Sequence, residues 1–204
     1  MSVAVIGAGN FGKNHVRTLH QLGVLSAVAE MSPKLREQLA TDYPGLRVHD
    51  GHGPLLADTD ITAVTIATPA HTHHAIAKAF LEADKDVFVE KPMTLTVADA
   101  EDLQRLAEKH GRILMVGHLL MYQPAVKFIH DLLKDGGLGR VFTLHQERAK
   151  LGKARAVENA LWSLGVHDIA VLLFLVGESP DQVSAFGHRG LQQNIEDDLY
   201  VHLT

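Results

Sequence analysis

Short apolar runs alternate with longer stretches of helical spacing along the first 117 residues. The apolar runs lie at residues 2–6, 25–29, 63–67, 86–89 and 113–116, with a weaker one at 47–49. Helical spacing of apolar residues is found between them, at 10–22, 33–41, 71–83 and 97–110. Strands that are apolar on both faces are typical of a parallel sheet covered by helices. Together with the right-handed crossover rule, this pattern predicts a doubly wound α/β domain at residues 1–118.

Two of these predicted helices begin with capping signals. Thr96 is followed three residues later by Asp99, which resembles a capping box. Ser32 precedes Pro33, and proline is favoured at the first position of a helix. We therefore expect helices to begin directly after Thr96 and Ser32.

The pattern changes after Gly117. We expect helices at 124–134 and 165–176, and strands at 141–150, 182–187 and 198–204. This order predicts an α+β domain with an open sheet at residues 119–204. The last segment alternates apolar and polar residues as far as Thr204. We expect it to be an edge strand or, alternatively, part of a sheet left incomplete by truncation of a longer domain.

Composition excludes several classes of partner. The 204 residues carry a formal net charge of -5, which predicts no basic surface for nucleic acid. The absence of cysteine excludes disulfides and thiolate metal sites. The first residues lack the basic start of a signal peptide, and no apolar run is long enough for a membrane span. We expect a soluble cytoplasmic protein that binds neither nucleic acid nor membrane.

A glycine-rich turn directly follows the first predicted strand. Its sequence is Gly7-Ala8-Gly9-Asn10-Phe11-Gly12, a G-x-G-x-x-G that opens a helix. The first glycine allows the tight turn, the second lets a pyrophosphate approach, and the third lets the helix pack on the strand. We therefore expect these residues, including Asn10 and Phe11, to bind a dinucleotide at the helix N-terminus.

The second predicted strand is followed by Glu30. A carboxylate there accepts hydrogen bonds from both ribose hydroxyls of the adenosine and repels a 2′-phosphate. Glu30 therefore favours NAD over NADP as the cofactor.

Three histidines lie close together after the fourth predicted strand. Thr68 and Pro69 end the strand, and His71, His73 and His74 follow. No carboxylate accompanies them at metal-ligand spacing. We expect no metal site here, and instead a helix start beside the cofactor cleft, with Thr68, Pro69 and His73 near the cofactor.

The fifth predicted strand is followed by Glu90, Lys91 and Pro92. Doubly wound folds bind their ligands at the carboxyl edge of the sheet, which is where this strand ends. Glu90 is suited to accept a hydrogen bond from the nicotinamide ribose. Lys91 is suited to donate or accept a proton in the cleft, and Pro92 fixes the backbone between them.

Four segments together resemble one family of oxidoreductases. GAGNFGKNHV, TPAHTHH, EKP and LGVHDI occur in this order along the chain. They resemble the Gfo/Idh/MocA family, named for glucose–fructose oxidoreductase and inositol dehydrogenase. The resemblance implies a Rossmann domain joined to a domain whose open sheet covers the active site and often forms the oligomer contact. It also implies that Lys91 is catalytic and that Glu90 helps to hold the cofactor.

The family's second catalytic element is usually an aspartate followed four residues later by a histidine. The histidine matches His167, but the aspartate position is Ser163. Asp168 is adjacent to His167, although consecutive helical residues point about 100° apart. The resemblance thus implies that His167 is catalytic, and it disfavours a dyad of the inositol dehydrogenase kind.

Residues 147–168, ERAKLGKARAVENALWSLGVHD, indicate the class of substrate. This segment resembles that of the subgroup that oxidises the C3 hydroxyl of UDP-activated N-acetylamino sugars. We expect His118 to lie near the nicotinamide and Lys91 and His167 to contact the substrate. The other expected substrate-binding residues are Tyr122, Arg148, Arg155, Asn159 and Trp162. Arg148 and Arg155 are suited to bind a diphosphate, because guanidinium groups match phosphate oxygens.

These expectations combine into one mechanism, and two alternative functions remain. We expect a sugar carbon to transfer hydride to NAD, with His167 or Lys91 taking the hydroxyl proton. His167 is the favoured base, because its ordinary pKa lies near neutrality. The alternatives are a dehydrogenase of a free polyol or monosaccharide, and an NAD-binding regulator or scaffold without turnover. We expect a homo-oligomer formed through the C-terminal sheet.

Overall fold

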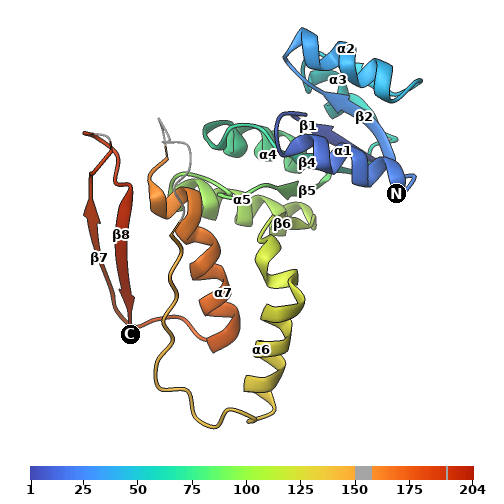
Figure 1. The fold of residues 1–204 in the computed structure, drawn as a ribbon. Coiled ribbons are helices and arrows are strands. Elements are labelled where there is room, and N and C mark those ends of the chain that lie inside the picture. Colours follow the sequence, from blue (N-terminus) through green and yellow to red (C-terminus); the bar gives the residue numbers. More distant parts are fainter. Residues whose placement is uncertain (150–157, 192) are drawn as a thin grey trace. The chain divides into compact units, whose positions relative to one another are not determined.

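The computed structural model describes residues 1–149, 158–191 and 193–204. It divides into two compact units, Met1–Gly117 and His118–Thr204, and most of their helices and strands are labelled in Figure 1.

The first unit contains a six-stranded parallel sheet, as predicted. Its strands lie in the order β3-β2-β1-β4-β5-β6. They are β1 (Val3–Ile6), β2 (Leu25–Ala29), β3 (Arg47–His49), β4 (Ala63–Ile66), β5 (Asp86–Val89) and β6 (Leu114–Val116). The order reverses between β1 and β4, and such a reversal is the ligand-binding point of doubly wound folds. The predicted fold class is confirmed.

Helices connect the strands of this sheet. They are α1 (Gly12–Gln21), α2 (Pro33–Asp42), α3 (Gly53–Ala57), α4 (His73–Glu82) and α5 (Val97–His110), with a 3₁₀ turn at Ala70–Thr72. The capping predictions are confirmed: Ser32 Oγ accepts from the Leu35 N–H, and Thr96 Oγ1 accepts from the Asp99 N–H. Helix α3 was not predicted, since five residues are too few to show helical periodicity.

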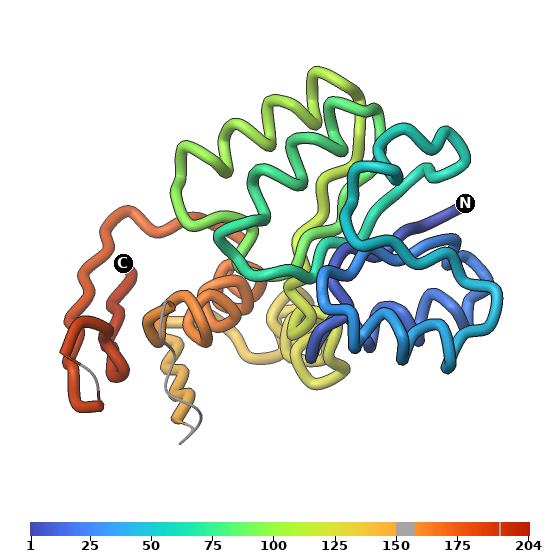
Figure 2. Tube along the Cα trace, turned by 90° about the horizontal axis from the view of Figure 1, so that it is seen from above, coloured from blue at the N-terminus to red at the C-terminus, as the bar shows by residue number. Residues whose placement is uncertain are grey.

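Alternate residues of the central strands belong to two separate cores. Ala4 and Ile6 of β1 belong to a core that includes residues of α4 and α5. Val5, between them, belongs to a core with Val16 of α1 and Leu39 of α2. In Figure 2, α4 and α5 (green) lie side by side on one face of the sheet, and α1 and α2 (blue) lie on the other. This two-faced burial explains why the strands are apolar throughout.

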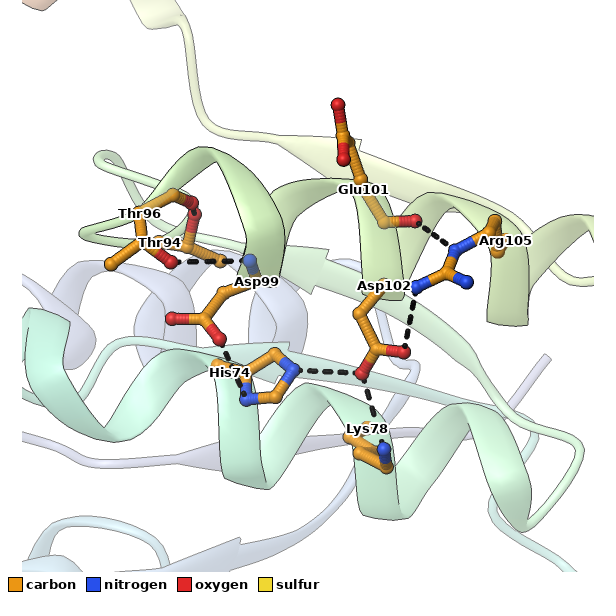
Figure 3. A network of polar contacts seen from close by, with 8 residues as sticks. All are labelled: His74, Lys78, Thr94, Thr96, Asp99, Glu101, Asp102 and Arg105. Carbon is orange, nitrogen blue, oxygen red and sulfur yellow. Dashed lines mark hydrogen bonds and ion pairs between the residues drawn. The ribbon is translucent and has the colours of Figure 1, made fainter.

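A polar network joins the outer sides of α4 and α5 (Figure 3). Asp102 on α5 accepts hydrogen bonds from Lys78 Nζ at 3.1 Å and from His74 Nε2 at 2.9 Å. Arg105 lies 3.5 Å from the other oxygen of Asp102, and His74 Nδ1 lies 3.7 Å from Asp99. The hydrogen bonds from His74 and Lys78 hold the pKa of Asp102 below its ordinary value. The network therefore favours the ionised form of Asp102 in the folded protein.

We predict that Asp102→Asn lowers the melting temperature at pH 7. The folded-state pKa of Asp102 is depressed, so its carboxylate contributes stability above the ordinary aspartate pKa of 3.8, and this contribution is lost as the pH falls through the lower folded-state value. The difference in melting temperature between variant and wild type should therefore shrink on acidification through this range. Glu101→Gln is the matched control on the same helix, because the Glu101 carboxylate points away from this network in Figure 3. Calorimetric melting at pH 7 and at a pH below 3.8 tests this prediction. An equal difference in melting temperature at the two pH values would contradict it.

In its described residues, the second unit contains two α-helices and a two-stranded antiparallel sheet. Its elements are a 3₁₀ turn at Leu119–Tyr122, α6 (Pro124–Lys134), a π-helical turn at Leu161–Gly165, α7 (Val166–Val176), β7 (Val183–His188) and β8 (Asp198–Leu203). The His130 ring stacks on the Phe174 ring with centroids 4.3 Å apart, which joins α6 to α7. In the register of the sheet Val183 pairs with Leu203 and His188 with Asp198.

The prediction of a strand from residue 141 was wrong for residues 141–149. These residues are exposed and have no regular secondary structure, and residue 150 lies outside the described part of the chain. A strand requires a neighbour that accepts and donates its backbone hydrogen bonds. In the described residues of this unit, β7 and β8 pair with each other and not with residues 141–149.

No helix in the described ranges is both long and apolar enough to span a membrane.

Candidate functional site

Two of the three motif glycines are required by close backbone contacts. Gly7 has a φ of +87°, and a Cβ there would lie 2.9 Å from the Ala67 carbonyl oxygen. A Cβ on Gly12 would lie only 2.0 Å from the Gly7 carbonyl oxygen. A Cβ on Gly9, by contrast, would meet nothing within 4 Å. The fold therefore needs Gly7 and Gly12, whereas Gly9 leaves open space beside the backbone, as a phosphate group would require.

Glu30 lies beside this turn at the carboxyl end of β2. Its Oε2 accepts from the Ala8 N–H at 2.7 Å, and its Oε1 accepts from the Ser32 N–H at 2.8 Å. Arg36 donates to the Glu30 carbonyl at 2.9 Å and to the Met31 carbonyl at 2.7 Å. A carboxylate oxygen can accept more than one hydrogen bond, so Glu30 retains capacity for ribose hydroxyls.

Glu90 follows β5 and is held by a histidine from α1. It is only 8% exposed, and its Oε1 lies 2.7 Å from His15 Nε2. The Phe11 and Phe88 rings contact the His15 ring edge-on, at centroid distances of 5.8 and 5.4 Å. The Lys91 N–H donates to Glu90 Oε2 at 3.3 Å. The contact between α1 and β5 thus fixes the carboxylate directly before Lys91.

His15 was not among the predicted site residues. The sequence does contain a signal for it, because residue 15 lies one turn into the helix that the glycine motif opens, and this helix begins at the carboxyl edge of the sheet.

The three clustered histidines have different surroundings. The His73 side chain is buried, with its Nδ1 2.8 Å from the Pro92 carbonyl oxygen and its Nε2 2.8 Å from the Thr68 carbonyl oxygen. His74 binds Asp102, as described above, and His71 is exposed. Within the described ranges, no group of three or more histidine or carboxylate side chains could hold a metal ion. The neighbouring Thr68 hydroxyl lies 2.7 Å from the Thr72 hydroxyl, which orders the turn after β4.

The first unit therefore brings most of the predicted cofactor residues to one edge of its sheet. The carboxyl ends of parallel strands share that edge, and the structure places there the glycine turn, Glu30, Thr68-Pro69 and Glu90-Lys91. Asn10 and Phe11 lie exposed on the glycine turn. The peptide bond between Lys91 and Pro92 is cis.

In the second unit, His167 occupies the first turn of α7 and is 9% exposed. The π-helical turn directly before it contains Trp162 and Ser163. π-Helical turns are rare and occur frequently at functional sites. His118 directly precedes the 3₁₀ turn that ends at Tyr122. Tyr122 is exposed, and Lys127 Nζ lies 5.6 Å from its ring centroid.

Arg148 and Asp168 form a two-point ion pair. Arg148 Nε donates to both carboxylate oxygens of Asp168, at 2.8 and 2.9 Å, and Nη2 lies 2.7 Å from Oδ1. Gln146 also donates to Asp168 at 2.6 Å. Asp168 raises the pKa of the Arg148 guanidinium above its ordinary value. Each charge is thus already paired within the protein, which reduces what Arg148 offers to a phosphate and what Asp168 offers to His167.

The other predicted substrate residues differ in their contacts. Asn159 Oδ1 accepts from the Trp162 N–H at 3.1 Å, and Asn159 Nδ2 lies 3.4 Å from Glu196. Asn159 therefore supports the start of the π-helical turn. Arg155 lies outside the described residues.

The doubly wound sheet of the first unit and the residues at its carboxyl edge are those of dinucleotide-binding α/β proteins. Residues 1–118 match the model of the GFO_IDH_MocA family, described as an oxidoreductase family with an NAD-binding Rossmann fold. The chain belongs to this family. The prediction of NAD as the cofactor is confirmed, and the first unit is an NAD-binding Rossmann domain.

Several relatives have stated activities. The chain is 30% identical over 188 residues to UDP-N-acetylglucosamine 3-dehydrogenase of Acidithiobacillus ferrooxidans, a match that covers 92% of this chain and 58% of that enzyme. It is 34% identical over 185 residues to inositol 2-dehydrogenase of Mycolicibacterium smegmatis, covering 87% and 53%. A crystal structure of GenD2 from gentamicin A biosynthesis in complex with NAD matches with a TM-score of 0.84 and 28% identity, covering 98% of this chain and 61% of that one. The chain thus spans less than two thirds of the length of each relative.

We predict that one glycine substitution in the turn weakens NAD binding and that another reduces stability. Gly9→Ala should leave the melting temperature of the cofactor-free protein unchanged, because its Cβ meets no atom within 4 Å. It should weaken NAD binding about tenfold or more, since the Cβ occupies space the pyrophosphate needs. Gly12→Ala should instead reduce the free energy of unfolding by roughly 1–3 kcal/mol or more, because its Cβ overlaps the Gly7 carbonyl.

Thermal melting without cofactor and calorimetric NAD titration separate the two effects. Gly51→Ala is the control, because a Cβ there also meets nothing within 4 Å and residue 51 lies outside the glycine motif. Full NAD affinity in Gly9→Ala would show that the pyrophosphate does not pass Gly9.

Proposed function

We propose that the chain acts as an NAD-dependent dehydrogenase that oxidises a hydroxyl group of a sugar. The main observation that supports this proposal is the position of Glu90 and Lys91 at the carboxyl edge of the sheet. The glycine turn and Glu30 lie at the same edge. The family is one of oxidoreductases, and relatives of this chain include dehydrogenases of a nucleotide sugar and of inositol. In this proposal residues 1–118 hold the cofactor and residues 119–204 contribute to the substrate site.

The cofactor residues divide by the part of NAD that they hold. The turn from Gly7 to Gly12 and the N-terminus of α1 receive the pyrophosphate, because unpaired N–H groups and the helix dipole favour anions. Glu30 accepts from the adenosine ribose. Thr68, Pro69 and His118 lie near the nicotinamide half, and Glu90 accepts from its ribose. His73 has both ring nitrogens directed at backbone carbonyls, so it acts on this site indirectly.

Two side chains handle the proton in the proposed reaction. When bound, NAD accepts the hydride from the carbon that bears the hydroxyl group. His167 takes the hydroxyl proton, and Lys91 donates a hydrogen bond to the same oxygen as it becomes a carbonyl. The products are then a keto sugar, NADH and a protonated His167. The reverse assignment, with Lys91 as base and His167 as donor, is the alternative within this mechanism.

For the substrate we propose a UDP-N-acetylamino sugar oxidised at C3. Ser163 occupies the position of the expected aspartate, which separates this chain from the inositol dehydrogenase pattern. The similarity to UDP-N-acetylglucosamine 3-dehydrogenase supports the same assignment. Tyr122, Asn159, Trp162 and Arg155 remain candidate contacts to the substrate.

A free polyol or monosaccharide is the second candidate substrate. The ion pair between Arg148 and Asp168 favours it, because an arginine already held by a carboxylate is less available to a diphosphate. The 34% identity to inositol 2-dehydrogenase agrees with this alternative.

We also propose that the two-stranded sheet contributes to a homo-oligomer contact. Val183, Phe186 and Tyr200 on β7 and β8 are all more than 60% exposed. Exposed apolar side chains on a short sheet are suited to bury against another copy of the chain.

We predict that NADH forms with UDP-N-acetylamino sugars and that both Lys91→Ala and His167→Ala reduce turnover about 10²–10⁴-fold. Each variant removes a group that donates or accepts a proton at the reacting oxygen. The measurement is NADH absorbance with UDP-N-acetylglucosamine, its uronic acid, UDP-glucose, myo-inositol and glucose as the panel. His71→Gln, exposed and outside the proposed site, is the control variant.

Turnover confined to myo-inositol or glucose would establish the second candidate in place of the first. Calorimetric NAD binding without turnover of any panel member would favour the NAD-binding regulator or scaffold.

A further inference from the structure

The ladder between β4 and β5 has a constant offset up to Glu90. The Asp86 N–H donates to the Thr62 carbonyl at 3.1 Å, and the Glu90 N–H donates to the Ile66 carbonyl at 2.9 Å. Both bonds join residues 24 positions apart (86 and 62, 90 and 66). The next bond of this kind would run from residue 92 to the Thr68 carbonyl.

Residue 92 is a proline, so this next bond cannot form. Proline has no backbone N–H. The Thr68 carbonyl oxygen instead lies 2.8 Å from His73 Nε2, and the Pro92 carbonyl oxygen lies 2.8 Å from His73 Nδ1. One imidazole ring thus connects the two backbone segments at the position where the ladder is interrupted. We refer to these two contacts as the His73 bridge.

The surroundings of the ring suit a fixed connection. The His73 side chain is 1% exposed, and its backbone begins α4, which packs on β4 and β5. Pro92 and Thr94 are buried on the other side of the bridge. A buried ring in van der Waals contact with its neighbours has little rotational freedom. The His73 bridge therefore holds the carbonyl of Pro92, the residue directly after Lys91, at a defined distance from the end of β4.

We propose that His73 is a positioning residue, whose bridge to Pro92 sets the orientation of Lys91 at the NAD site. This inference rests on the proposed role of Lys91 in the reaction. Glu90, on one side of Lys91, is fixed by the ladder and by His15. Pro92, on the other side, is fixed by His73. Lys91 is thereby held from both sides, and a shift of about 1 Å at a reacting group can reduce the rate about 10²-fold.

Substitutions of His73 by asparagine and glutamine can separate the two contacts of the His73 bridge. A backbone carbonyl only accepts, and a neutral imidazole carries a single N–H, so each contact is a hydrogen bond only in the tautomer that has the N–H on that nitrogen, and both are hydrogen bonds at once only in the imidazolium form. Asparagine places its NH₂ group close to the position of Nδ1, and glutamine places its NH₂ group close to that of Nε2. His73→Asn should therefore keep the contact to Pro92, and His73→Gln should keep the contact to Thr68. His73→Leu places an apolar side chain of similar size at this position and removes both contacts.

The test reads the environment of Lys91 without any substrate. The protein carries [¹³C,¹⁵N]-lysine, and the side-chain NMR signal of Lys91 is assigned with Lys91→Arg. We expect this signal to stay near the wild-type position in His73→Asn and to move in His73→Gln and His73→Leu. His71→Gln, the exposed neighbouring histidine, is the control and should leave the signal in place. Calorimetric NAD titration and thermal melting accompany each variant.

Measuring turnover of the same variants provides a second test. With a panel substrate, His73→Gln and His73→Leu should lower kcat about 10–100-fold while KM for NAD stays near the wild-type value. His73→Asn should restore most of the lost rate.

The outcomes separate the proposal from the proposed function. A Lys91 signal that is unchanged in His73→Leu, or that is equally displaced in the asparagine and glutamine variants, would overturn the positioning role. A signal that follows the expected order, in a wild-type protein without turnover of any panel member, would support the bridge and count against the proposed reaction instead.

Discussion

The tight packing of Gly12 against the backbone of Gly7 is the contact on which the cofactor edge depends. No side chain fits between these two residues, so α1 begins directly against the end of β1. This start directs the first N–H groups of α1 toward the edge where the strands end. It also places His15 one turn later, where it reaches Glu90 after β5. One close approach therefore sets both the proposed phosphate site and the carboxylate beside Lys91.

Much of the first unit could be predicted from its sequence because its signals are local. Apolar runs identify strands buried on both faces, and Ser32 and Thr96 identify two helix starts. The glycine motif and Glu30 could be placed at one edge because the carboxyl ends of parallel strands converge there. Contacts between segments that are distant in sequence were harder to predict. The pairing of His15 with Glu90 and of His73 with Pro92 depends on side-chain directions between segments that are separated along the chain, which periodicity does not report.

In the second unit, single charged residues predict the candidate site less well than the glycine motif does in the first. The sequence suggests Arg148 as a diphosphate ligand, and it presents Asp168 only as the neighbour of His167. The structure pairs them with each other, because a planar guanidinium matches a carboxylate at two points. Residues 141–149 fail as a predicted strand for a related reason. The side chains of a segment can favour a strand, but they do not supply the neighbouring strand that its backbone requires.

If Glu30 binds the adenosine ribose as proposed, the two hydrogen bonds that it accepts from Ala8 and Ser32 link cofactor preference to the shape of the turn. A carboxylate that only recognised ribose could be exchanged freely as a lineage changed its cofactor. Here the same two oxygens also hold the glycine turn and the start of the segment before α2. Replacing Glu30 would leave two backbone N–H groups without their acceptor, so a change of cofactor would require compensating changes in the turn. Adaptation toward a 2′-phosphorylated cofactor is therefore a problem of several coupled substitutions in this chain.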